Sequence, residues 1–226
     1  MKSLDFKHRF ISSPSQQNQN TVNSGKEYGP KNNHPDTLTL LLLHGTGGNE
    51  DDLIQVGQMI SSTASLLSPR GKVLENGMPR FFRRLTEGVF DLDDLKIRTK
   101  ELADFVKEAS RTYHFDMNKT IAVGFSNGAN MAASLLLSYP ETIRAAILFR
   151  AMVPFIPNSQ PNLSDKRVLL SAGVFDPIVS ESQTQNLFDL LEKSGAHVIL
   201  KWQQSGHNLT ESDILYSKKW LDDIFK

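Results

Sequence analysis

The sequence predicts an α/β fold of three layers, in which helices cover both faces of a mainly parallel sheet of about seven strands. Short apolar runs alternate along the chain with longer segments whose apolar residues recur at helical spacing, a pattern typical of repeated strand-helix-strand units. Most of the short runs are apolar at every position, as expected for parallel strands buried on both faces. The chain has 226 residues, so we expect residues 1–226 to form a single domain.

The N-terminal region predicts an edge strand, a polar insert and the first buried strand. Residues 6–12 alternate apolar and polar side chains, which indicates a strand with one exposed face. Residues 13–36 are rich in Gln, Asn, Ser, Gly and Pro, a composition that favours a polar loop or flexible insert. Residues 37–43 then form a nearly continuous apolar run of strand length.

The next segments predict a helix, a strand and a long loop. A helix is expected to begin near Asn49, where capping and acidic residues precede an inner stripe of Leu53, Val56, Met59 and Ile60. Residues 64–68 have strand composition, and residues 69–91 break the periodic pattern with glycines, prolines, aromatic residues and arginines. Loops of this length are usually functional or disordered. Because this loop leaves a strand at its carboxyl end, we expect it to overhang the functional site.

The rest of the chain continues the alternation. Residues 92–113 have apolar positions near helical spacing and lead into a strand that begins at Thr120. An alanine-rich helix follows and ends at Tyr139-Pro140. The remaining elements are expected to be strands at 143–149 and 167–172, a helix at 181–194, a strand at 197–202 and a helix at 209–225.

The motif Gly124-Phe125-Ser126-Asn127-Gly128 joins a predicted strand to a predicted helix. At such a turn a nucleophilic serine is held in a strained conformation, and small flanking residues are needed because the two backbones nearly touch. The same pentapeptide also occurs by chance as a glycine-rich turn. Its position between strand and helix is what makes Ser126 a candidate nucleophile.

Two further candidates follow from the rule that ligand sites of an open parallel sheet form beyond the carboxyl ends of its strands. His207 lies in the loop that leaves the last strand, whereas His197 opens that strand at the opposite edge. Asp176 comes just after the preceding strand and is the acid best placed at the same edge. His207 would then take the serine proton while Asp176 orients the imidazole. Taken singly, a loop histidine is more often a surface group, and an aspartate before proline a turn former.

Attack on a carbonyl also needs hydrogen-bond donors for the oxyanion. The backbone N–H of Asn127 is one candidate, and Thr46, in the loop after the first buried strand, is the other. A rival interpretation treats residues 44–48 as a phosphate-binding turn. That segment lacks the Lys and Ser/Thr of a P-loop and the spacing of a dinucleotide-binding motif.

Four stretches of the sequence carry a family resemblance: residues 41–50 (LLLHGTGGNE), residues 75–84 (ENGMPRFFRR), residues 124–131 and Gly206-His207. Together they resemble the carboxylesterase/phospholipase branch of the α/β-hydrolase superfamily, and within it the bacterial MhqD-type hydrolases. The resemblance covers residue 38 to the C-terminus. It implies an α/β-hydrolase fold, a catalytic triad of Ser126, Asp176 and His207, and carboxylic-ester hydrolysis without a metal ion or organic cofactor.

The walls of the substrate site are expected from loops at the carboxyl edge of the sheet. The predicted substrate-binding residues are Gly47, Met78, Phe81, Phe82, Met152 and Val153. Aromatic residues of the long loop, Phe90 among them, would serve equally well to anchor that loop. Arg80, Arg83 and Arg84 could bind a substrate carboxylate, but we favour the more usual solvated face for a run of arginines. No separate lid domain fits between residues 149 and 167, so a small apolar pocket is expected.

The composition limits the partners. The 25 Lys and Arg residues balance the 25 Asp and Glu residues, so the net charge indicates neither nucleic acid nor an anionic membrane surface. The chain has no cysteine, which excludes disulfides and a thiolate nucleophile. No run reaches the ~18 apolar residues of a membrane span. We therefore expect a cytoplasmic protein, without membrane insertion, whose partner is a small-molecule ester, and we leave its assembly open, a homodimer included.

These inferences predict a serine hydrolase that cleaves small carboxylic esters through an acyl-enzyme. A thioesterase or a lactone hydrolase would use the same residues, and the sequence does not separate them. Because a fold alone does not establish a function, a non-catalytic ligand-binding homologue is a further alternative. The presence of Ser126, Asp176 and His207 together disfavours it.

Overall fold

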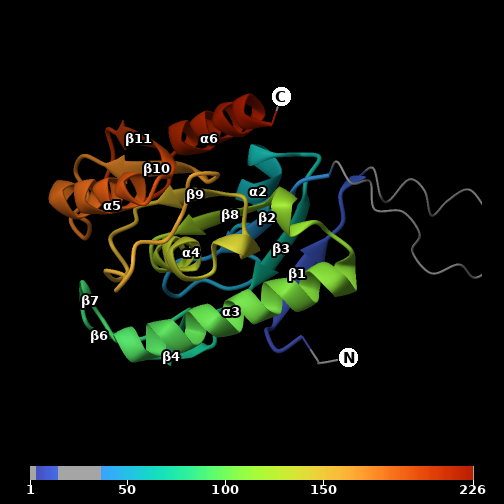
Figure 1. Cartoon of the computed structure of the whole chain (residues 1–226), viewed down its shortest axis with the longest axis horizontal. Coiled ribbons are helices and arrows are strands. Elements are labelled where there is room, and N and C mark those ends of the chain that lie inside the picture. The colour runs from blue at the N-terminus through green and yellow to red at the C-terminus, as the bar shows by residue number, and fades with distance from the viewer. Residues whose placement is uncertain (1–3, 15–36, 226) are drawn as a thin grey trace, which may run out of the picture.

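A seven-stranded sheet with the strand order β1-β3-β2-β8-β9-β10-β11 forms the centre of the computed structural model, which describes residues 4–14 and 37–225 (Figure 1). Its strands are β1 (His8–Ile11), β2 (Thr39–Leu43), β3 (Ser65–Pro69), β8 (Thr120–Phe125), β9 (Ala145–Phe149), β10 (Arg167–Gly173) and β11 (His197–Gln203). β1 pairs antiparallel with β3 at one edge, and the other neighbouring pairs are parallel. The predicted mainly parallel sheet and its N-terminal edge strand are confirmed.

Helices cover both faces of this sheet. They are α2 (Ile54–Ile60), α3 (Leu92–Tyr113), α4 (Asn127–Ser138), α5 (Glu181–Lys193) and α6 (Glu211–Ile224), with short 3-10 helices at Met117–Lys119 and Pro140–Thr142. Successive side chains of a strand point to opposite faces. Accordingly Leu41 and Leu43 of β2 pack in one core with α3, α4 and α5, and Leu40 and Leu42 pack in a second core with α2 and α6. The three-layer prediction is therefore confirmed.

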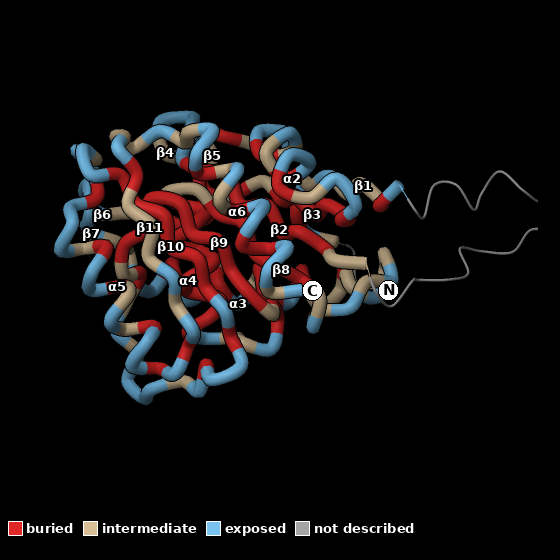
Figure 2. The backbone as a smooth tube through the Cα atoms, turned by 90° about the horizontal axis from the view of Figure 1, so that it is seen from above, coloured by how far each residue is buried: buried red, intermediate tan, exposed pale blue. Residues whose placement is uncertain are grey.

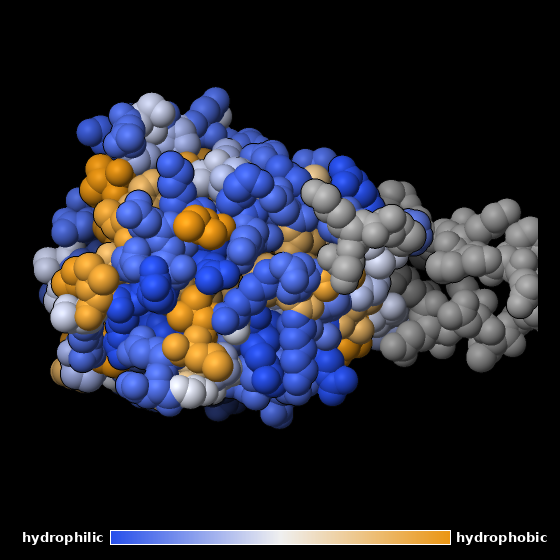
Figure 3. Space-filling view, turned by 90° about the horizontal axis from the view of Figure 1, so that it is seen from below, coloured by the Kyte–Doolittle hydropathy of each residue, from blue (hydrophilic) through white to orange (hydrophobic). Residues whose placement is uncertain are grey.

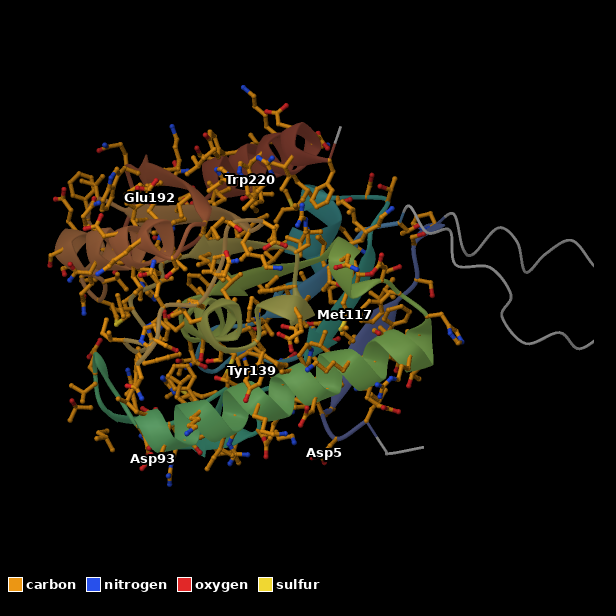
Figure 4. The ribbon with its side chains drawn as sticks, in the orientation of Figure 1. Asp5, Asp93, Met117, Tyr139, Glu192 and Trp220 are labelled. Carbon is orange, nitrogen blue, oxygen red and sulfur yellow. The ribbon has the colours of Figure 1, made fainter. Side chains whose placement is uncertain are left out.

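The buried residues concentrate along the central strands and on α4, as the red segments of Figure 2 show. On the outer helices one side is buried: Trp220 of α6, labelled in Figure 4, belongs to the core beneath that helix. The face of the molecule seen in Figure 3 is mainly hydrophilic, with apolar side chains in small separate groups. None of the helices in the described parts of the chain is long and apolar enough to span a bilayer.

The start of α2 corrects one sequence prediction. The helix begins at Ile54, five residues after the predicted position. The side chain of Asn49 accepts a hydrogen bond from the backbone of Asp51 at 2.8 Å, and such local bonds favour turns over helix. Met59 is 45% exposed and does not belong to the inner stripe, whereas Leu53 and Ile60 are buried.

Residues 69–91 are not one structureless loop but contain two β-hairpins. The first pairs β4 (Val73–Glu75) with β5 (Met78–Arg80), and the second pairs β6 (Arg84–Thr86) with β7 (Val89–Phe90). Asn76 and Gly77 both have positive φ, 51° and 80°, in the first turn. An Asn-Gly pair is the preferred sequence for such a two-residue hairpin turn, so the signal for this hairpin was present in the chain.

The predicted insert at 13–36 lies almost wholly outside the described residues. Its first residue, Ser13, is buried, and its backbone N–H donates to Ser65 Oγ at 3.2 Å. The chain therefore leaves the edge of the sheet from a fixed point beside β3.

Candidate active site

Ser126 occupies a tight turn between β8 and α4. Its backbone has φ 52° and ψ −114°, in the left-handed half of conformational space that non-glycine residues rarely adopt. A Cβ atom on Gly128 would lie 2.0 Å from Leu43 O, and one on Gly124 would lie 2.6 Å from the Cα of Ala129. The flanking glycines are therefore required because backbone passes against backbone on both sides of the serine.

Ser126, His207 and Asp176 lie in one hydrogen-bonded series. His207 Nε2 is 2.9 Å from Ser126 Oγ, and His207 Nδ1 is 2.8 Å from Asp176 Oδ2. The carboxylate can only accept, so Nδ1 carries the proton and Nε2 is free to accept from the serine hydroxyl. The side chain of Asp176 is 1% exposed and that of His207 is 18% exposed, so the acid is enclosed while the imidazole reaches the cavity.

The loop after β10 fixes the orientation of Asp176. Its Oδ1 accepts hydrogen bonds from the backbone N–H groups of Ile178 at 2.8 Å and Val179 at 3.0 Å. These bonds leave Oδ2 for His207. The neighbouring loop after β11 can approach because a Cβ on Gly173 would lie only 2.3 Å from Gly206 O.

A buried ion pair holds the loop that carries His207. Arg150, immediately after β9, is fully buried and pairs with Asp213 of α6 at 2.8 Å. Its Nε donates to Gly206 O at 3.0 Å and its Nη2 to Asn208 O at 2.8 Å. The carbonyl groups on both sides of His207 are therefore bonded to one guanidinium group. No sequence signal singled out Arg150 or Asp213.

Burial disfavours the ionised form of Asp213, but hydrogen bonds to the carboxylate more than offset this cost. Desolvation acts to raise the pKa of this carboxyl, whereas hydrogen bonds from Arg150, Ser171 and Thr210 lower it, and the net pKa lies below its usual range. The carboxylate also belongs to the capping box at the start of α6, where Thr210 N–H donates to it at 2.8 Å. Asp213 thus joins the end of one strand, the His207 loop and a helix N-terminus.

The buried residue His44, two positions before Thr46, orders the loop after β2. His44 Nε2 accepts from the backbone N–H of Gly71 at 2.9 Å, so its proton lies on Nδ1, which donates to Gly45 O at 2.7 Å. Burial lowers the pKa of His44, which favours this neutral form. The N–H of Gly47 donates to Pro79 O at 2.9 Å and ties the loop to the first hairpin.

A cavity of about 310 Å³ opens beside Ser126 and His207. Both candidate oxyanion residues, Thr46 and Asn127, line it. The other lining residues are Arg80, Arg84, Glu87, Gly88, Phe90, Phe125, Asn130, Met152 and Ile178. The hairpins of residues 69–91 thus supply one wall.

Of the six predicted substrate-binding residues, Met152 lines the cavity. Its position is fixed by a bond from its backbone N–H to Asn130 Oδ1 at 2.9 Å. Gly47, Met78 and Val153 lie outside the lining, in the neighbouring loops and hairpin.

The prediction that Phe81 and Phe82 line the cavity is wrong. They are 2% and 0% exposed and belong to the core on the α3 and α4 face. Phe81 is drawn inward because its backbone N–H donates to Asn127 Oδ1 at 2.7 Å, and the ring of Phe82 packs edge-on against Phe90 at 5.0 Å. The anchoring alternative is correct for Phe81 and Phe82, whereas Phe90 lines the cavity.

The interpretation of the three arginines as a solvated face is also wrong for Arg80. That residue is 3% exposed, and its Nη1 donates to Thr46 Oγ1 at 2.7 Å. Arg84 is partly buried in the cavity wall, and only Arg83, with 62% of its side chain exposed, faces solvent.

Asn130 and Phe125 also line the cavity, although the sequence did not predict it. Asn130 is three positions after Asn127 on α4, and residues at that spacing share a helix face, so its place could have been inferred. Among residues 4–14 and 37–225, no three His, Asp or Glu side chains cluster in a way that would hold a metal ion.

The sheet order, the covering helices and the serine at a strand-to-helix turn define an α/β-hydrolase fold. The family model described as Phospholipase/Carboxylesterase matches residues 30–223. The chain therefore belongs to the phospholipase/carboxylesterase family of hydrolases.

Individual relatives agree with this assignment. MhqD of Bacillus subtilis (strain 168) is 49% identical over 184 residues, which are 81% of this chain and 92% of MhqD. The crystal structure of the Bacillus cereus carboxylesterase superposes with a TM-score of 0.86 at 44% identity, covering 97% of this chain and 94% of that one. A structure of YahD with malic acid has a TM-score of 0.83 at 31% identity, covering 96% of this chain and 98% of YahD.

Proposed function

We propose that this protein is a serine esterase that hydrolyses small carboxylic esters through an acyl-enzyme formed on Ser126. The observation that carries the proposal is the hydrogen-bonded series from Ser126 through His207 to Asp176 at the edge of a cavity. Ester hydrolysis also agrees with the family and with the carboxylesterase relative.

In the first half-reaction Ser126 Oγ attacks the ester carbonyl carbon and His207 Nε2 takes the hydroxyl proton. The tetrahedral intermediate collapses, and His207 gives this proton to the departing alcohol. In the second half-reaction a water molecule attacks the acyl carbon, His207 takes a proton from it, and Ser126 leaves with that proton. One ester and one water thus become one acid and one alcohol.

The remaining residues assist without exchanging protons with the substrate. Asp176 holds the imidazole in the required tautomer and stabilises the imidazolium. The backbone N–H of Asn127 and the residue Thr46 are the proposed donors to the oxyanion. Because Thr46 Oγ1 already accepts a hydrogen bond from Arg80, its own hydroxyl proton is available to another acceptor.

The size and walls of the cavity favour small substrates. A volume of about 310 Å³ lies at the low end for small-molecule sites. Phe90, Phe125, Met152 and Ile178 supply apolar surface beside the serine. The presence of malic acid, a small carboxylic acid, in the structure of YahD supports a small acid as a product of this chain too.

The test is turnover of p-nitrophenyl acetate and butyrate by wild type, Ser126→Ala and Asp176→Asn. We expect kcat to fall by about 10⁴-fold or more for either variant, because each removes a member of the proton-transfer series. Ser138→Ala, which changes an exposed serine at the end of α4, is the matched control. Turnover by Ser126→Ala close to wild type would refute the proposal.

A thioesterase or lactone hydrolase would use the same residues. Comparing kcat/KM for phenyl butyrate, S-phenyl thiobutyrate and γ-butyrolactone separates these activities. We expect the oxygen ester to be preferred, and a higher kcat/KM for the thioester or the lactone would reassign the substrate class while keeping the mechanism.

A further inference from the structure

Arg80 and Arg84 bring two guanidinium groups to one wall of the cavity at Ser126. Arg80 ends β5 and Arg84 begins β6, so the two hairpins place them together. Their side chains are 4% and 29% exposed. Neither group takes part in the proton transfers of ester hydrolysis, so their position at the reactive serine needs another explanation.

Among residues 4–14 and 37–225, Glu75 is the acid that pairs with both arginines and neutralises them in part. Its Oε2 lies 3.2 Å from Arg80 Nε, and its Oε1 lies 2.8 Å from Arg84 Nη2. The hydrogen bond from Arg84 lowers the pKa of Glu75, so the carboxyl is ionised at neutral pH. Arg80, Arg84 and Glu75 together carry a net charge of +1, and burial of an unbalanced charge is unfavourable without a partner.

Both guanidinium groups retain donors for a ligand. Arg80 uses Nε toward Phe82 O at 3.2 Å and Nη1 toward Thr46 Oγ1 at 2.7 Å. Arg84 uses Nε and Nη2 toward Glu75. A guanidinium carries five N–H donors on three nitrogens, so a third nitrogen remains on each. Because Arg80 donates to Thr46, and both line the cavity at Ser126, an anion bound here would lie beside the ester group.

Glu87 is the one acidic residue among those lining this cavity, and it would oppose an anion. It lies in the exposed turn between β6 and β7, where water and salt screen its charge. Arg80 is buried, and the interactions of a buried charge are screened much less. The local potential at the wall is therefore set by the arginines.

We propose that the substrates of this protein carry an anionic group, a carboxylate in the simplest case, which Arg80 and Arg84 hold while the ester carbonyl lies at Ser126. Half-esters of small dicarboxylic acids have this arrangement. Guanidinium groups recognise carboxylates through parallel charge-assisted hydrogen bonds. The proposal rests on the proposed esterase function and specifies its substrate class.

The test compares two p-nitrophenyl esters of equal chain length, the anionic hemisuccinate and the neutral levulinate. We expect wild type to have the higher kcat/KM for the hemisuccinate, and Arg84→Gln to lower the ratio of the two values about tenfold, the usual effect of losing one charged hydrogen bond. Arg84→Lys should retain most of the preference. Arg83→Gln is the matched control, because its exposed neighbouring side chain lies outside the cavity lining, and it should keep the wild-type ratio.

A second substrate pair, 3-acetoxybenzoate and its methyl ester, places the charge on the alcohol side of the ester. Because Arg84 is partly exposed, added NaCl should screen its charge, lower kcat/KM of wild type for the preferred anionic ester and leave the neutral one unchanged, a result that depends on no variant. Hydrolysis of neutral esters without an anion preference in either pair, or a preference that Arg84→Gln leaves intact, would overturn the anion site and leave the esterase standing. Absence of hydrolysis for all four esters would overturn both.

Discussion

The backbone of Ser126 is held in a conformation that costs on the order of 1–3 kcal/mol for a non-glycine residue. The surrounding structure offsets this cost. The N–H of Ser126 donates to Phe149 O at 2.9 Å, and α4 begins at the next residue. Strain of this kind persists where it serves a function, and at Ser126 it directs the hydroxyl toward His207.

At the level of single residues, the sequence predicted positions better than side-chain directions. Ser126, Asp176 and His207 come together because each lies on a loop or turn that leaves a strand at the same edge of the sheet. Arg80 ends a hairpin strand and Phe81 lies in the bend that follows it, so their directions depend on how the two hairpins pack. A segment interpreted as a loop predicts no such packing, so both residues were misplaced.

The pH dependence of stability tests how much one buried acid, Glu50, contributes to the fold as a charged group. Burial acts to raise the pKa of Glu50, but bonds from its own backbone, Arg70 and Lys7 lower it from 4.5 to about 2. Since the folded pKa lies below the unfolded one, the stabilisation is complete above pH 4.5 and is lost as the pH falls toward 2. Glu50→Gln should lower the free energy of unfolding at pH 7 by up to about 3 kcal/mol.

Urea denaturation of wild type and Glu50→Gln at pH 7, 4 and 3 measures this effect. The difference between the two proteins should shrink as the pH falls. Asp51→Asn is the matched control, because the neighbouring Asp51 pairs with Arg9 at the exposed surface and such pairs contribute little. A difference for Glu50→Gln that is independent of pH would contradict the charged role of this residue.

At the level of whole elements, the success of the predictions followed the strength of local signals. The bounds of α3 were predicted correctly because its apolar pattern is long and Asp91 caps it, accepting from the backbone N–H of Asp94 at 3.0 Å. The start of α2 was missed because Asn49 forms a turn. The contacts of Arg150 with the His207 loop join residues 56 and 58 positions apart, and no local pattern encodes them.

Arg150 provides a prediction about the loop after β11. Arg150→Met should lower kcat about 10²-fold, because a displacement of His207 by about 1 Å is enough for such a loss. It should also destabilise the fold by about 3–5 kcal/mol, because Asp213 is left buried without its partner. The measurements are steady-state turnover and the free energy of unfolding.

The double variant Arg150→Met/Asp213→Asn separates positioning from stability. Removing both charges should recover part of the stability, whereas Gly206 O and Asn208 O still lack their donor and kcat should stay low. Recovery of wild-type kcat in the double variant would show that Arg150 acts on stability alone.

At the scale of the whole molecule, the parallel sheet assembles the site. β8, β9 and β10 lie side by side and β11 follows at the edge, so the loops that leave them meet at one end. The fold could be predicted because alternating strands and helices with short connections leave few topologies. The cavity could not be predicted, because one of its walls comes from two hairpins. The packing of these hairpins depends on contacts such as that between Phe81 and Asn127.

The central claim is that three distant segments make Ser126 a nucleophile, and covalent labelling tests it most directly. A fluorophosphonate should phosphonylate the intact protein once, with fluoride as the leaving group, and peptide mass spectrometry should place the adduct on Ser126. Ser126→Ala should remain unlabelled, and His207→Ala should be labelled far more slowly. A single adduct on another residue, or equal labelling of Ser126→Ala, would contradict the account.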